Sequence, residues 1–161
     1  MIHHVSIPAR NPKHVAAVLA ELMGGTIHPF AGPLQGAFAV LTSDPHGSGI
    51  EIYPDGTALK PGEGDHMLSM PVEAPVAFHP VHVLMSVKAD RATIERVGER
   101  EGWRTRHFWR GPRNGPKVFE LYEFWVENRI LLELATEDMM ANYTKTWQVD
   151  AMTTLMGRVA V

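Results

Sequence analysis

The sequence has 161 residues, of which 45% are hydrophobic and 20% are charged, and its formal net charge is −3. This composition is ordinary for a globular protein, and it argues against a nucleic-acid-binding surface, which would be strongly basic. Cysteine is absent, so any metal ion must be held by histidine and carboxylate side chains. No apolar run is long enough to cross a membrane, and the N-terminus does not resemble a secretion signal. We therefore expect a cytoplasmic protein without a membrane partner.

The first part of the chain predicts one strand, one helix and three further strands. Residues 2–8 form the first strand, and a helix follows between Asn11, a suitable N-cap, and the Gly24–Gly25 pair that ends it. Short strands separated by Gly, Pro, Asp and Ser follow at 26–30, 36–42 and 49–54. We assign residues 1–54 to a first βαβββ module.

Residues 55–79 are rich in glycine and proline and show no clear period, which predicts a linker. The first pattern then recurs within residues 80–136, which we assign to a second βαβββ module. Its strands and its helix are predicted at 81–87, 90–101, 103–109, 117–126 and 129–135. Residues 137–161 form a C-terminal helical extension, with Met140, Tyr143, Trp147 and Ala151 on one side. We expect this side to pack against the sheet or a subunit partner, with a lid over a pocket as the alternative.

The two modules align as an internal repeat. A shift of 78 residues places His4 on His82 and Gly24 on Gly102. Sequence identity is thin, but the order of the elements, the helix length and the positions of the glycines agree. The sequence therefore predicts an α+β protein built from one supersecondary unit used twice.

Two histidines and two glutamates occupy matching places in this repeat. Because side chains alternate along a strand, His4 and His82 face away from the helix of their module. Glu51 and Glu133 do the same in the last strand of each module. A carboxylate in an apolar strand needs a partner or a cation. Two imidazoles and two carboxylates suit a divalent ion, namely Zn, Ni, Co, Mn or Fe.

Each of these four residues also has a plain structural interpretation. A single strand histidine is more often a structural residue than a ligand, and a single buried glutamate is more often half of an ion pair. Arg10, Arg104 and Arg129 are available as partners. The four residues in register within the repeat favour the metal site. We do not expect His3, His79 or His107 to be ligands.

The sequence resembles the vicinal oxygen chelate superfamily, which includes glyoxalase I, methylmalonyl-CoA epimerase, extradiol dioxygenases, fosfomycin-resistance enzymes and bleomycin-resistance proteins. The resemblance lies in "IHHVSIPARNPKHVAAVLAELMGG", "VHVLMSV" and "RILLELA" and covers about residues 2–135. It implies paired βαβββ modules with curved sheets around a cleft. It also implies metal ligands at His4, Glu51, His82 and Glu133, with Glu51 or Glu133 as the catalytic base.

The resemblance implies a metal-dependent lyase or isomerase acting on a small substrate with vicinal oxygens, through an enediolate-type intermediate. Extradiol dioxygenases place histidine where Glu51 stands, so Glu51 counts against a ring-cleaving dioxygenase. Pro8 and Asp55 replace the Arg and Asn that glyoxalase I uses for glutathione, so we do not expect glutathione. The other alternative is a metal-free, ligand-sequestering protein of the bleomycin-resistance type, whose four polar residues would pair with each other or with arginines. A homodimer is the default expectation, and its modules close within one chain or swap between two.

Several further residues are candidates for the pocket. Tyr53 shares the face of Glu51, and either Glu120, Tyr122 and Phe124 or Leu121, Glu123 and Trp125 line the cleft. The basic segment 106–117 is interpreted as a solvated hairpin turn, with an anion clamp as the alternative. Its charged residues are Arg106, His107, Arg110, Arg113 and Lys117.

Overall fold

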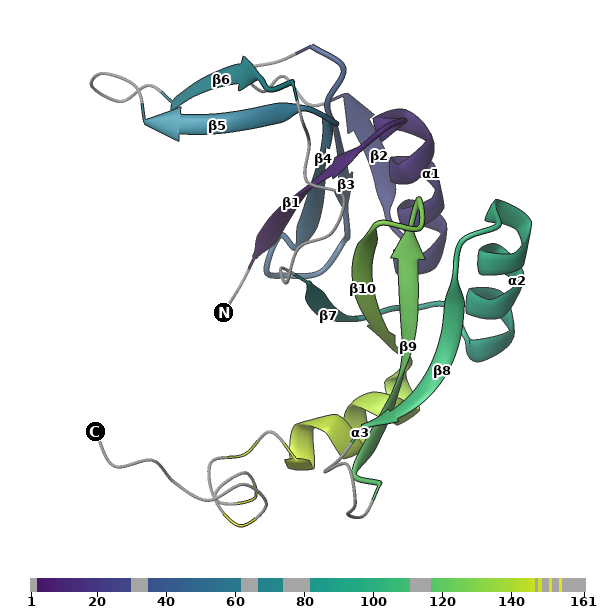
Figure 1. Cartoon of the computed structure of the whole chain (residues 1–161). Helices are drawn as coiled ribbons and strands as arrows, with labels where there is room; N and C mark the ends of the chain where they lie inside the picture. Colours follow the sequence, from purple (N-terminus) through teal and green to yellow (C-terminus); the bar gives the residue numbers. More distant parts are fainter. Residues whose placement is uncertain are drawn as a thin grey trace. The chain divides into compact units, whose positions relative to one another are not determined.

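The computed structural model describes residues 3–29, 35–61, 67–73, 82–110 and 117–146, and the single positions 148, 151 and 154 (Figure 1). The chain divides into two compact units. The first is Met1–Val81 with Val126–Ile130, and the second is His82–Trp125 with Leu131–Val161. Each unit contains a four-stranded sheet built in the predicted order of strand, helix and three strands. The predicted α+β class with two βαβββ modules is confirmed.

The first unit is a mixed sheet covered by one helix. Its strands follow the order β1-β4-β3-β2, in which β1 runs parallel to β4 and the other neighbours are antiparallel. The elements are β1 (His4–Ala9), α1 (Pro12–Met23), β2 (Thr26–Pro29), β3 (Phe38–Leu41) and β4 (Gly49–Pro54). Helix α1 packs against β3 and β4 through its apolar face. That face buries Val15, Ala16, Val18, Leu19, Leu22 and Met23.

The second unit repeats this arrangement. Its strand order is β7-β10-β9-β8, with β7 parallel to β10 and β8 antiparallel to β9. The elements are β7 (Val83–Ser86), α2 (Arg91–Glu101), β8 (Thr105–Arg110), β9 (Phe119–Val126), β10 (Ile130–Ala135) and α3 (Glu137–Thr146). Both sheets therefore pair the first strand of the module with the last, which sets the histidine-bearing strand beside the glutamate-bearing strand.

The helix ends show why the repeat was visible in the sequence. The side chains of Asn11 and Asp90 cap α1 and α2 by accepting the backbone N–H three residues later, at 3.3 and 2.8 Å. Gly24 and Gly102 end the two helices in the left-handed region, each with φ of 64°. The same local solution thus starts and stops both helices.

The connecting segment 55–79 contains a hairpin that the sequence analysis did not predict. Strands β5 (Thr57–Pro61) and β6 (Met67–Pro71) form a two-stranded antiparallel sheet. Gly56, with φ of 80°, makes the turn into β5. The glycines and prolines of this stretch punctuate short strands and do not mark a structureless linker. The first unit accordingly extends beyond residue 54, to Val81.

The turn between β9 and β10 belongs to the first unit. Glu127 accepts the backbone N–H groups of Arg10 and Asn11, at 2.7 and 3.0 Å. Helix α1 has no acidic residue in its own first turn, so Glu127 supplies the negative charge that a helix N-terminus favours. Arg129 in the same turn binds Asp55.

Helix α3 begins at Glu137, where the C-terminal helix was predicted to begin. Its most buried residue is Met139, with no exposed surface, and Tyr143 packs edge-on against Phe119 with ring centroids 5.3 Å apart. The buried face is therefore turned relative to the predicted one, which began at Met140. Trp147, predicted for that face, lies outside the described residues.

Among the described residues, no helix has the length and apolar character needed to cross a membrane.

Candidate functional site

His4 and Glu51 meet on neighbouring parallel strands of the first unit. Glu51 lies opposite Ser6 in the register of β1 and β4, and His4 is two residues earlier on β1, so all three share one face of the sheet. The Nε2 atom of His4 is 3.8 Å from Oε1 of Glu51. The His4 side chain is 61% exposed and that of Glu51 only 19%. A nearly buried carboxylate thus faces an accessible imidazole.

The second oxygen of Glu51 is held by hydroxyl groups. Ser6 Oγ donates to Oε2 at 2.8 Å, and the Tyr53 hydroxyl donates to the same oxygen at 3.4 Å. Burial and the charge of Glu51 raise the pKa of Tyr53, so its hydroxyl remains a donor at neutral pH. The prediction that Tyr53 shares the face of Glu51 is confirmed. These two donors fix the carboxylate and leave Oε1 toward His4.

A pocket of about 370 Å³ opens beside this pair. Its polar side chains are His4, His28 and Glu51. The rest of its lining is apolar or glycine, namely Pro29, Ala39, Leu41, Gly47, Gly49 and Ile50. His28 was missed by the sequence analysis, although it alternates with Ile27 in a strand and its position there was a usable signal. The register puts His28 opposite Ala39, which in turn lies opposite Glu51, so all three share one row.

His82 and Glu133 reproduce the first pair in the second unit. Glu133 lies opposite Leu84 on the parallel strand β7, again two residues after the histidine. The Nε2 atom of His82 is 4.0 Å from Oε2 of Glu133, and their side chains are 48% and 13% exposed. The two units therefore present a histidine and a glutamate with the same register, nearly the same separation and the same contrast in exposure.

The environment of Glu133 differs from that of Glu51 because it contains an arginine. Arg110 Nη2 donates to Oε1 of Glu133 at 2.9 Å and to Oε1 of Glu123 at 2.7 Å. Burial opposes the charge of Arg110, but its hydrogen bonds to the two carboxylates outweigh this and raise its pKa. The sequence analysis named Arg10, Arg104 and Arg129 as possible partners of the glutamates, and the structure gives Arg110 instead.

Arg110 also corrects the interpretation of segment 106–117 as a solvated turn. Residues 105–110 form strand β8, and Arg110 is only 32% exposed, between two carboxylates. Arg113 lies outside the described residues. Arg106 and Arg110 both lie over the ring of Phe108, at 4.8 and 5.2 Å from its centroid. The aromatic ring and the carboxylates together hold the guanidinium at the site.

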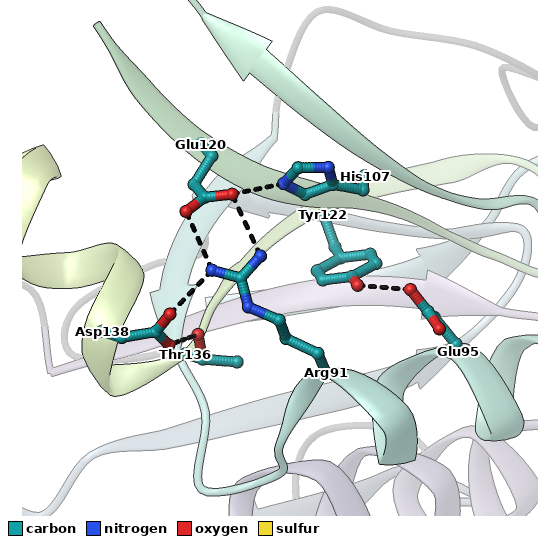
Figure 2. A network of polar contacts seen from close by, with 7 residues as sticks. All are labelled: Arg91, Glu95, His107, Glu120, Tyr122, Thr136 and Asp138. Atoms are coloured by element: carbon teal, nitrogen blue, oxygen red, sulfur yellow. Dashed lines mark hydrogen bonds and ion pairs between the residues drawn. The ribbon is translucent and has the colours of Figure 1, made fainter.

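The opposite face of this sheet carries a separate polar network (Figure 2). Arg91 of α2 binds Glu120 through both amino groups, at 3.0 and 2.8 Å, and Asp138 of α3 at 2.7 Å. Glu120 also binds His107 at 2.6 Å. The hydrogen bond from Arg91 lowers the pKa of Glu120 against the effect of burial, with His107 adding to it. This network ties α2, β8, β9 and α3 together.

The network decides which residues of β9 share the face of Glu133. The Tyr122 hydroxyl donates to Glu95 of α2 at 2.5 Å, and burial followed by the charge of Glu95 raises the pKa of Tyr122 to about 12. Glu120, Tyr122 and Phe124 therefore face the helix, and Glu123 lies on the face of Glu133. His107 belongs to the helix side, and His3 bonds the carbonyl of His46 at 2.7 Å. His79 lies outside the described residues.

Each His–Glu pair has the donor chemistry and the spacing of a divalent-metal half-site. Imidazole nitrogen and carboxylate oxygen suit Zn and similar ions, and two donors that each lie about 2.1 Å from one ion are at most about 4.2 Å apart. The separations of 3.8 and 4.0 Å fall within this limit. Within the described residues, no group of three or more His, Asp or Glu side chains is arranged to hold a metal ion. Each unit by itself thus supplies two ligands.

The fold matches solved structures of known proteins. The fosfomycin resistance protein FosX from Listeria monocytogenes is 13% identical, with a TM-score of 0.53 over 89% of this chain and 97% of that chain. Integron cassette proteins from the mobile metagenomes of V. cholerae and V. pseudocholerae are 13% and 15% identical. Both have a TM-score of 0.50 over 85% of this chain and 94% of theirs. No protein-family model and no curated protein matches the sequence.

Fosfomycin-resistance enzymes belong to the superfamily that the sequence resembles, so the resemblance is confirmed at the level of the fold. At identities of 13–15%, the likeness establishes the architecture and leaves the reaction open. The chain therefore has the two-module fold of the vicinal oxygen chelate proteins.

Proposed function

We propose that the protein is a divalent-metal-dependent lyase or isomerase that acts on a small substrate with vicinal oxygens. In this proposal His4, Glu51, His82 and Glu133 are the ligands of one ion. The observation that carries it is the duplicated His–Glu pair, with the same strand register in both units and nitrogen–oxygen separations of 3.8 and 4.0 Å. A structural histidine or a single ion pair does not require this duplication.

The bound ion would polarise a substrate oxygen and favour loss of a proton from the neighbouring carbon. Glu51 is the better placed of the two candidate bases. It lines the pocket, and Ser6 and Tyr53 hold only one of its oxygens. Glu133 instead carries Arg110 on one oxygen. We therefore assign proton transfer to Oε1 of Glu51 and a role in metal binding to Glu133.

The pocket supports a compact substrate. Three polar side chains stand among apolar and glycine residues within about 370 Å³, which suits a molecule with a few oxygens and a short apolar part. Asp55 is held by Arg129 at 2.6 Å, so it is engaged inside the protein and does not serve as a glutathione contact. A small 2-oxo or 2-hydroxy acid fits this description.

Exchange of substrate protons with deuterated water tests the proposed reaction. The metal-loaded protein is incubated with a panel of 2-oxo and 2-hydroxy acids, and exchange at the carbon next to the carbonyl is followed by proton NMR. We expect exchange for at least one compound and its loss in Glu51→Gln, whereas the matched variant Glu21→Gln, on the exposed face of α1, retains it. Exchange that is equally fast in Glu51→Gln would refute the assigned base.

The second candidate is a metal-free ligand-binding protein, and one observation favours it. This function predicts that the four polar residues pair with each other or with arginines, and Arg110 binds Glu133 at 2.9 Å. The test is ligand binding after dialysis against a chelator. Fosfomycin belongs in the panel because the Listeria protein is a fosfomycin resistance protein. Binding that is unchanged by removal of metal would favour this function over the enzyme.

A further inference from the structure

The two glutamates of the proposed metal site are held by partners of different charge. Each carboxylate turns one oxygen toward its histidine, Oε1 in Glu51 and Oε2 in Glu133. The other oxygen of Glu51 accepts neutral hydroxyl donors, first of all Ser6 at 2.8 Å. The other oxygen of Glu133 accepts the Arg110 guanidinium at 2.9 Å. The repeat is therefore symmetric in its ligands and asymmetric in its charge.

This difference matters for a divalent cation. The two oxygens of one carboxylate are only about 2 Å apart, so an ion on Oε2 of Glu133 would stand within several ångströms of the guanidinium on Oε1. Two positive charges at that distance repel each other strongly in a half-buried setting. Glu133 is 13% exposed and Arg110 is 32% exposed, so water screens this repulsion only in part.

Glu123 offers the guanidinium a second position. Its Oε1 lies 2.7 Å from the same Nη2 atom that binds Glu133, and its side chain is 14% exposed. Phe108 supports the guanidinium from the side, with its ring centroid 5.2 Å away. Arg110 can release Glu133 and remain bound to Glu123 and over the ring, without moving into solvent.

From these contacts we infer that Arg110 is an internal counter-cation of the metal site, which competes with a divalent ion for Glu133 and shifts to Glu123 when the ion binds. Arg110 and Glu123 then set the metal affinity and the cation selectivity of the site. A monovalent ion gains no charge advantage over the guanidinium and does not displace it, whereas a divalent ion does. This inference rests on the proposed metal-binding function.

The opposite role for Arg110 is that of a supporting residue that orients Glu133 for the metal. Supporting hydrogen bonds of this kind raise metal affinity, and their removal weakens it by about 10- to 100-fold. The two roles therefore predict opposite changes when the arginine is removed, which makes the inference testable by metal affinity alone.

The experiment measures Zn²⁺ affinity of the full chain by competition with a chromophoric chelator. We expect Arg110→Gln to bind Zn²⁺ about ten-fold more tightly than the parent protein. The matched control Arg106→Gln removes the same charge from the same face of β8, over the same Phe108 ring, and should change the affinity less than two-fold. Tighter binding in both variants to the same degree would show a general charge effect and overturn the inference.

Glu123 provides the second arm of the experiment. Glu123→Gln should weaken Zn²⁺ binding about ten-fold in the parent, because Arg110 then has only Glu133. In the Arg110→Gln background the same change should have little effect, since Glu123 acts through the arginine. An equal loss in both backgrounds would mean that Glu123 attracts the ion directly, and it would overturn this inference.

Arg110→Lys guards against a folding defect in Arg110→Gln. Lysine keeps the charge but cannot hold both carboxylates with a fork of donors, so its Zn²⁺ affinity should lie between those of the parent and Arg110→Gln. Zn²⁺ binding to the parent with equal or weaker binding in Arg110→Gln and Arg110→Lys overturns the inference and leaves the proposed function standing. A parent that binds no Zn²⁺ overturns both.

Discussion

Arg129 and Asp55 form a two-point ion pair inside the first unit, with Nη1–Oδ2 and Nη2–Oδ1 distances of 2.6 and 3.3 Å. The two side chains are only 9% and 18% exposed. Removal of the arginine would leave the Asp55 charge without its partner and with little water around it. We expect Arg129→Gln to lower the free energy of unfolding by about 3 kcal/mol, measured by urea denaturation. The exposed Arg106→Gln should stay within about 0.5 kcal/mol of the parent, and a similarly small change in Arg129→Gln would contradict this prediction.

The network around Glu120 predicts a loss of stability in acid. Its contacts with Arg91 and His107 lower the folded pKa of Glu120 below the ordinary value of 4.5. A group with a depressed folded pKa contributes stability above its unfolded pKa, and this contribution is lost as the pH falls through the folded pKa. Glu120→Gln should therefore be less stable than the parent at pH 7, and the difference should shrink below about pH 4.5. Denaturation curves at pH 7, 5, 4 and 3 test this, and a constant difference would contradict it.

Gly98 allows α2 to approach β8 closely. A Cβ atom at this position would lie 2.0 Å from Oγ1 and 2.6 Å from Cβ of Thr105. Gly98→Ala should therefore cost about 1–3 kcal/mol of stability through overpacking. The same substitution in a Thr105→Gly background should cost clearly less, because the atoms in conflict are gone. Equal losses in the two backgrounds, measured by thermal melting, would show that the contact is not the cause.

Ser6 should influence metal affinity without binding the metal. Its hydroxyl holds Oε2 of Glu51 at 2.8 Å, and loss of such a supporting hydrogen bond weakens metal binding by about ten-fold or more. We expect this loss in Ser6→Ala and no change in Ser86→Ala, which removes an exposed hydroxyl from β7. Titration with Zn²⁺ measures both affinities. Unchanged affinity in Ser6→Ala would remove Ser6 from the site.

The sequence predicts most of the fold because the determinants are local. Helix caps at Asn11 and Asp90 and left-handed glycines at Gly24 and Gly102 act within one turn, and strand alternation sets the faces of His4 and Glu51. These signals recur in both modules, so the repeat was readable without any knowledge of tertiary contacts. The hairpin of β5 and β6 was missed because short strands between glycines and prolines resemble a linker.

The parts of the site that were missed depend on pairing between strands. Arg110 precedes Glu133 by two strands, and only the sheet order β10-β9-β8 brings them together through Glu123. His28 enters the pocket only through its register with Ala39. Nothing local in the sequence distinguishes Arg110 from Arg106 or gives the register of His28. Sequence patterns therefore located the four candidate ligands and left their charged and polar surroundings undetermined.

The metal content of the protein, purified without an affinity tag, tests the central proposal most directly. Elemental analysis is made on the parent, on His4→Ala and on Glu133→Ala after incubation with Zn, Ni, Co and Mn. We expect about one divalent ion per chain in the parent and a clear loss in both variants, since one ion needs ligands from both modules. Absence of metal from the parent under all four conditions, or full retention of metal in both variants, would contradict the proposed function.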